Sequence, residues 1–117
     1  YTLSHSMIAV CDESGVLGLG GIVGGVPTGC SETTTNVYLE AAYFDPLRIA
    51  RAGRALQVGS DARYRFERGV DPAFTLDAVE LATQMILDLC GGEAGRGIPT
   101  GENSPFRPEI FFTPAPF

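Results

Sequence analysis

The order of elements along the chain predicts an α+β fold, with short strands near the N-terminus and helices after them. Apolar runs separated by acidic or glycine-rich turns fill residues 7–23, a pattern typical of a hairpin. Two Asp-Pro pairs, at residues 45–46 and 71–72, each precede a stretch that favours helix. With 117 residues, 44% of them hydrophobic, the chain is long enough for one small domain with a core.

Three segments are expected to be strands. The apolar run 7–11 predicts a buried strand that ends at the turn signal of residues 12–15. The run 16–23 is interrupted by glycines and is expected to pair with it as a hairpin. After a turn-rich stretch, Val37 to Glu40 is expected to form a further strand because of its β-branched and aromatic side chains.

Three helices are expected after the strands. Asp45 can cap free N–H groups and Pro46 fits the first helical position, so we expect a helix from there to about Leu56. Ser60 is expected to cap a short helix that runs through residue 68 and ends at Gly69. A third helix is expected from residues 71–72 to the glycines at 91–92. Its apolar face would consist of Phe74, Ala78, Leu81, Ala82, Met85 and Leu89.

The composition changes after residue 92. Gly, Pro, Asn and Ser dominate residues 93–105, which predicts a linker. The apolar run 110–112 lies between prolines and is expected to be an edge strand or the first strand of a following domain. We therefore divide the chain into residues 1–92 and 93–117, and the start at Tyr1 suggests a piece of a longer protein.

The charges are distributed unevenly. The net charge of −6 argues against a stand-alone nucleic-acid binder. All eight cations are arginines, and six of them lie with four acids between Asp45 and Asp71, so this stretch is +2 and the remainder is −8. A solvated helix face is the common role for such arginines, with contact to phosphates as the alternative. Arg63 and Glu67 have the i,i+4 spacing of a helical ion pair.

Several classes of site are excluded or disfavoured. Three widely spaced cysteines and the single histidine, His5, do not have the spacing of a zinc site, so we expect free thiols and a surface histidine. A P-loop needs a lysine, and a dinucleotide fingerprint needs a glycine where this chain has Val23. No apolar run approaches the roughly 20 residues of a membrane span.

Three features leave a structural and a functional interpretation open. The glycines of residues 20–25 either allow tight packing or leave room for a ligand. Glu40 lies in an apolar run, so it is either outward-facing on a strand or inward-facing with a ligand hydroxyl as its partner. Ser60 is a helix cap, a ligand contact or both.

Residues 20–46 and 60–72, in this order and at this spacing, resemble the editing module of the bacterial phenylalanyl-tRNA synthetase β subunit. The resemblance covers roughly residues 5–92. It implies a β-sandwich-like layer with helices packed on one side, of which this chain would hold the C-terminal portion.

The resemblance also implies a substrate pocket in which mischarged tyrosyl-tRNA(Phe) is hydrolysed. Its residues would be Gly21, Gly24, Glu40, Ser60 and Ala62. Glu40 would bind the phenol group of tyrosine, and Ser60 stands where the family usually has threonine. The resemblance implies no Ser or Cys nucleophile and an editing-site histidine that lies upstream of this chain. We therefore assign no catalytic residue or metal ligand here, and expect the isolated chain to be inactive.

The implied partners are the rest of the β subunit, the α subunit and tRNA(Phe), in the cytoplasm and without a membrane. No cofactor is expected in this portion, whereas the whole ligase would use ATP and magnesium. Two alternatives stay open: a non-catalytic module that binds an amino acid or peptide, and a structural interaction domain. The sequence does not separate them, because pocket residues serve binding and catalysis alike.

Overall fold

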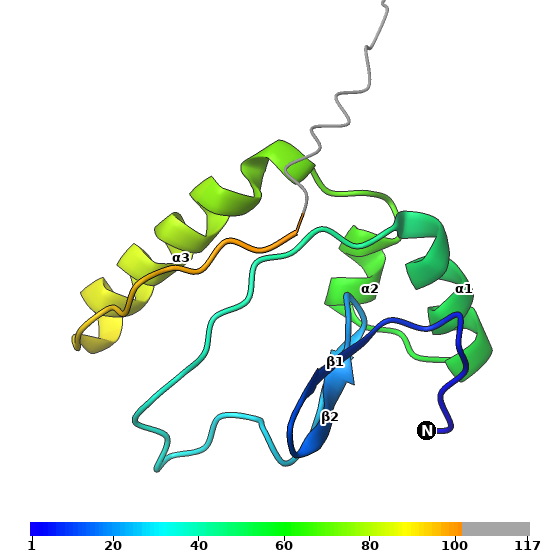
Figure 1. Cartoon of the computed structure of the whole chain (residues 1–117), viewed down its shortest axis with the longest axis horizontal. Helices are drawn as coiled ribbons and strands as arrows, with labels where there is room; N and C mark the ends of the chain where they lie inside the picture. Colours follow the sequence, from blue (N-terminus) through cyan, green and yellow to red (C-terminus); the bar gives the residue numbers. More distant parts are fainter. Residues whose placement is uncertain (102–117) are drawn as a thin grey trace, which may run out of the picture.

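The computed structural model describes residues 1–101, and the expected strand at 110–112 lies outside them. Three short strands come first in the chain and three α-helices follow (Figure 1). The α+β class is therefore confirmed. The described residues form one three-stranded antiparallel sheet in the order β1-β2-β3. The second layer of a sandwich is not among them.

The predicted hairpin is confirmed. β1 (Ala9–Asp12) pairs with β2 (Gly15–Leu19), and β2 pairs in turn with the two residues of β3 (Val23–Gly24). In the β1–β2 turn, Asp12 accepts hydrogen bonds from the hydroxyl and the backbone N–H of Ser14, at 2.6 and 2.7 Å. These two bonds lower the pKa of the Asp12 carboxyl, and the bond from the hydroxyl has the larger effect. β1 itself is mostly exposed, so the expectation of a buried first strand was wrong.

Local capping signals place the helices as predicted. α1 (Pro46–Leu56) begins after Asp45, whose carboxylate accepts from the N–H of Arg48 at 2.8 Å. α2 (Asp61–Phe66) begins after Ser60 and ends two residues before the predicted end at residue 68. A 3₁₀ turn, η1 (Pro72–Phe74), follows Asp71 and leads into α3 (Thr75–Cys90). α3 stops at Gly91, which has a φ of 71°.

The hydrophobic core joins the end of the sheet to α1. Its buried members are Leu19 and Ile22 beside the strands, and Ile49 and Ala52 on α1. Ile49 is the largest fully buried side chain, with 1% of its surface exposed. Partly buried side chains pack around this cluster, namely Met7, Ile8, Phe44, Leu56, Val58 and Phe66. The strands, α1 and α2 thus share one core, and we call these elements the packed unit.

The expected strand from Val37 to Glu40 is wrong. Residues 25–45 contain no helix or strand, and Figure 1 shows this connection swinging away from the hairpin before it reaches α1. Val37, Tyr38 and Leu39 are exposed. A strand persists only where a neighbouring strand takes up its backbone hydrogen bonds, and the described residues supply no such neighbour here.

The third predicted helix is confirmed as α3. None of its helical residues is buried, and large side chains of its apolar face, such as Leu81, Met85 and Leu89, are exposed. Figure 1 shows α3 apart from the hairpin and from α1. No described helix is both long and apolar enough to cross a bilayer.

Candidate functional site

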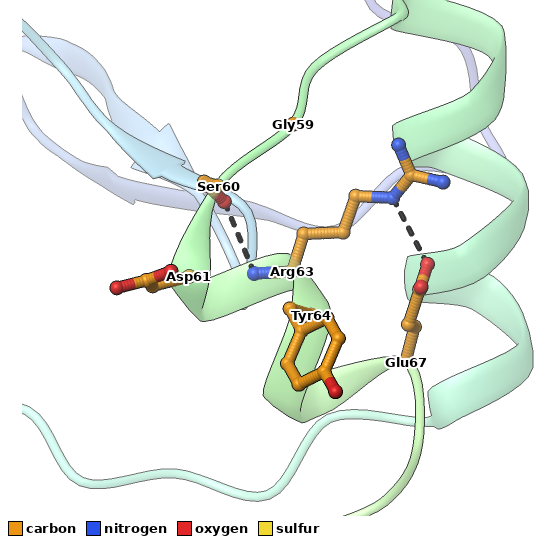
Figure 2. A pocket seen from close by; sticks show the side chains of 6 residues that line it. All are labelled: Gly59, Ser60, Asp61, Arg63, Tyr64 and Glu67. Atoms are coloured by element: carbon orange, nitrogen blue, oxygen red, sulfur yellow. Dashed lines mark hydrogen bonds and ion pairs between the residues drawn. The ribbon is translucent and has the colours of Figure 1, made fainter.

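A surface hollow of about 470 Å³ lies at the start of α2 (Figure 2). It is lined by Gly59, Ser60, Asp61, Arg63, Tyr64 and Glu67. One of these, Ser60, is among the pocket residues implied by the sequence resemblance. Ser60 is therefore the centre of the candidate site.

Ser60 connects α2 to the sheet. Its Oγ accepts a hydrogen bond from the N–H of Arg63 at 3.0 Å, which is the predicted helix cap. The same hydroxyl donates to the carbonyl oxygen of Ile22, at the turn between β2 and β3. One side chain therefore fixes the start of α2 against the glycine-rich turn, 38 residues earlier in the chain.

Arg63 and Glu67 form one wall of the hollow. Arg63 Nε donates to Glu67 Oε2 at 2.9 Å, and this predicted i,i+4 ion pair is confirmed (Figure 2). Arg63 Nη1 also donates to the carbonyl oxygen of Val58 at 2.7 Å. The two side chains are only 20% and 23% exposed. Their geometry is therefore held by packing and by hydrogen bonds together.

Gly53 on α1 makes room for this arrangement. A β-carbon at residue 53 would overlap Nε and Cδ of Arg63. Since Gly53 is buried inside a helix, where glycine is otherwise unfavourable, its lack of a side chain has a clear structural reason. α1 and α2 approach closely at this point.

Tyr64 and Asp61 form the outer rim. Both are exposed, and Figure 2 shows the Asp61 carboxylate directed away from the Arg63–Glu67 pair. Arg68 places its guanidinium carbon 3.7 Å from the centroid of the Tyr64 ring, a cation–π contact. The rim therefore combines an aromatic ring with an exposed carboxylate.

The chemistry of these residues suits binding more than nucleophilic attack. The lining contains no histidine or cysteine. Within residues 1–101, the hydroxyl of Ser60 bonds only to backbone groups, the carbonyl of Ile22 and the N–H of Arg63, so no basic side chain activates it as a nucleophile there. In residues 1–101, no group of three His, Cys, Asp or Glu side chains could hold a metal ion.

The other glycines of the implied pocket have different surroundings. Gly21 has a φ of +65°, and a β-carbon there would lie 3.1 Å from atoms of Phe44, Ile49 and Phe66. The space beside the Gly21 α-carbon is therefore filled by core side chains, and the left-handed backbone conformation at this position favours glycine. Gly24 is exposed at the end of β3, and a β-carbon there would meet nothing within 4 Å.

Glu40 and Ala62 complete the predicted set. Glu40 is exposed in the connection between β3 and α1, and its side chain makes no hydrogen bond or ion pair within residues 1–101. Ala62 is half-buried on α2, directly after two residues of the hollow. Among these residues, the structure joins only Ser60 to the glycine-rich turn beside Gly21 by a hydrogen bond.

Sequence reasoning missed part of the site. It did not single out Gly59, Asp61 or Tyr64 as lining residues, nor Gly53 as the point where α1 meets Arg63. The i,i+4 spacing of Tyr64 and Arg68 could have indicated their contact. The role of Gly53 carries no local signal, because its partner lies on another helix.

The amino-acid sequence matches a known protein family. Residues 1–91 match the family model described as the B3/4 domain. A phenylalanine–tRNA ligase β subunit of Paramagnetospirillum magneticum is 54% identical over 97% of this chain. The Ruegeria pomeroyi and Rhodospirillum rubrum proteins of the same name are 57% and 55% identical, over 86% and 98% of the chain. This chain spans only 13–14% of the length of these relatives.

Proposed function

The chain belongs to the B3/4 domain family, and we propose that it forms part of the pocket that edits mischarged tyrosyl-tRNA(Phe) in a phenylalanine–tRNA ligase. The observation that carries the proposal is the match of residues 1–91 to this family. The relatives also bear the name of the ligase β subunit.

The chemistry of the two amino acids explains why such a pocket is useful. Tyrosine differs from phenylalanine by one hydroxyl, and an apolar synthetic pocket rejects an added hydroxyl only weakly. A second pocket with a hydrogen-bond acceptor would favour tyrosine, because phenylalanine would leave that acceptor unpaired. The reaction would be hydrolysis of the ester that joins tyrosine to the tRNA.

In this proposal Glu40 accepts the hydrogen bond of the tyrosine phenol, while Gly24 and Ala62 leave space around the substrate. Gly21 would act indirectly, by allowing the left-handed turn that packs beside the pocket on the core. Ser60 would hold the start of α2 against the glycine-rich turn, as its bonds to Ile22 and Arg63 support. Since Glu40 lies in the connection outside the packed unit, this connection would have to close over the substrate. Water would be positioned by backbone groups, since the hollow offers no activated nucleophile.

The rest of the assembly follows from the same proposal. The remaining β subunit, the α subunit and tRNA(Phe) would be its partners in the cytoplasm. ATP and magnesium would act at the aminoacylation site, outside this segment. The isolated chain would be inactive.

The test is deacylation of tyrosyl-tRNA(Phe) by the complete enzyme that contains this segment. Replacing Glu40→Ala removes the acceptor and should lower kcat/KM for tyrosyl-tRNA(Phe), a loss of about 1–3 kcal/mol in transition-state binding. Glu32→Ala is the matched control, because Glu32 is an exposed carboxylate in the same connection. Equal deacylation by both variants and the wild type would remove Glu40 from the site.

A structural interaction domain is the second candidate, and two observations favour it. Gly21 faces core side chains instead of open space, and α3 exposes an apolar surface suited to packing against another domain. A wild-type enzyme that charges phenylalanine but does not hydrolyse tyrosyl-tRNA(Phe) would support this alternative over editing.

A further inference from the structure

A second hollow, of about 390 Å³, lies between α1 and α2. Its lining consists of Ala50, Arg54, Arg63, Glu67 and Arg68. Three guanidinium groups against one carboxylate give this arginine hollow a net charge of +2 on a chain with a net charge of −6. Such a local reversal of sign attracts anions.

The single carboxylate is already fully engaged. Glu67 accepts from Arg63 through Oε2 at 2.9 Å and from Arg68 through Oε1 at 3.2 Å. Arg63 is also bound to the carbonyl oxygen of Val58, so this pair acts as a fixed wall. The positive charge that remains belongs to Arg54 and Arg68.

Both of these arginines are held in place yet keep free donors. Arg68 lies on the ring of Tyr64, and its Nη1 donates to the carbonyl oxygen of Tyr64 at 2.7 Å. Arg54 donates through Nε to the carbonyl oxygen of Ala50 at 3.2 Å. The other guanidinium nitrogens, Nη1 and Nη2 of Arg54 and Nε and Nη2 of Arg68, make no hydrogen bond within residues 1–101. Side chains that are already ordered lose less entropy when they bind a ligand.

Other cations lie on the same helices but outside the hollow. Arg48 and Arg51 on α1 and Arg65 on α2 are exposed, and their side chains make no hydrogen bond or ion pair within the described part of the chain. They do not line the hollow, so its free positive charge is that of Arg54 and Arg68.

We propose that the arginine hollow binds the phosphate backbone of the tRNA, with Arg54 and Arg68 as the main contacts. Guanidinium groups match phosphate oxygens in geometry and charge. The proposal rests on the proposed function, since the hollow shares its Arg63–Glu67 wall with the hollow beside Ser60. Contacts here would hold the RNA while its aminoacyl end enters the editing pocket.

Chemical protection tests the proposal on the complete, unmodified enzyme. Phenylglyoxal modifies accessible guanidinium groups, and mass spectrometry reports the modified fraction at each arginine. We expect tRNA(Phe) to protect Arg54 and Arg68 several-fold, while Arg96, which is exposed outside the helices, stays reactive. Lack of protection at Arg54 and Arg68 would overturn the proposal. Equal protection by inorganic phosphate at the same phosphate concentration would identify a small-anion site and would also overturn it.

Charge reversal gives a second, kinetic test. Arg54→Glu should lower kcat/KM for deacylation of tyrosyl-tRNA(Phe) several-fold. It should also flatten the slope of log(kcat/KM) against log salt by roughly 0.7–0.9 for each phosphate contact that is lost. Arg96→Glu, which changes the charge equally, should leave both quantities unchanged. Arg54→Gln provides a milder variant for the case in which the reversal disturbs folding.

The two proposals fail in different ways. If the wild-type enzyme does not hydrolyse tyrosyl-tRNA(Phe), the editing function fails, while protection of Arg54 and Arg68 by tRNA still reports on the hollow. If the wild type hydrolyses it and Arg54→Glu changes neither kcat/KM nor the salt slope, the hollow does not bind the tRNA backbone and editing stands.

Discussion

α1 in the packed unit and α3 outside it are both regular α-helices, but they are stabilised differently. α1 buries Ile49 and Ala52 against the sheet and receives Arg63 of α2 against Gly53. α3 is longer, with 16 residues, yet none of its helical residues is buried. Most helix stability in proteins comes from packing an apolar face. Within the described residues, α3 buries no such face and has no side-chain cap at its N-terminus.

This difference indicates that α3, and not the packed unit, depends on contacts outside residues 1–101 to cover its apolar face. Leu81, Met85 and Leu89 would cost little to expose singly, but together they form an apolar surface on one helix. Under the proposed function, other parts of the β subunit would cover it. The contrast between α1 and α3 can be measured on the 117-residue chain itself.

The largest effect is expected in the core. Ile49→Ala removes the largest fully buried side chain and leaves a cavity, so the free energy of unfolding should fall by about 2–5 kcal/mol. Leu81→Ala on α3 should change it by less than about 0.5 kcal/mol, because Leu81 is exposed. Urea unfolding followed by circular dichroism measures both variants. Similar losses in the two would show that α3 contributes to the same core.

The contact between α1 and α2 should rank second. Gly53→Ala places a methyl group on Arg63, which must move and weaken its bonds to Glu67 and Val58. Overpacking of this kind costs about 1–3 kcal/mol. Gly59→Ala is the control, since a β-carbon there meets nothing within 4 Å. A Gly53 variant as stable as this control would mean that the two helices do not depend on their close approach.

Ser60 tests the link between α2 and the sheet. Ser60→Ala loses the cap to Arg63 and leaves the carbonyl of Ile22 without its hydroxyl donor, at a cost of about 0.5–2 kcal/mol. Ser60→Thr keeps a hydroxyl and should retain most of the stability. Melting temperatures of the three proteins provide the comparison, and equal values for the alanine and serine forms would contradict a structural role.

The smallest effect concerns the exposed turn of the hairpin. The bonds from Ser14 lower the pKa of Asp12 below its usual 3.8, so folding favours the charged carboxylate. Its stabilising contribution is complete above pH 3.8 and is lost as the pH falls through the lower folded-state pKa. Asp12→Asn should remove this part of the acid dependence of stability. An unchanged dependence would show that the turn bonds have no measurable effect.

Local sequence signals determined the helices of this protein. Asp45, Ser60 and Asp71 each accept a hydrogen bond from an N–H group two or three residues later. Each cap therefore depends only on residues that are close together in the sequence. The same holds for the hairpin turn and for the Arg63–Glu67 pair. Such contacts are set by spacing alone, and a single sequence is enough to predict them.

The tertiary structure decided what depends on distant partners. Val37 to Glu40 has the side chains of a strand, but residues 1–101 supply no neighbouring strand for it. Strand propensity alone does not satisfy backbone hydrogen bonds. Gly21 and Gly53 are required by side chains of other elements, and Ser60 reaches a carbonyl 38 residues away. For the candidate site, the sequence therefore supplied Ser60 as a cap. Only the packing of α1 and α2 onto the sheet created the hollows beside it, because a cavity is a property of several chain segments together.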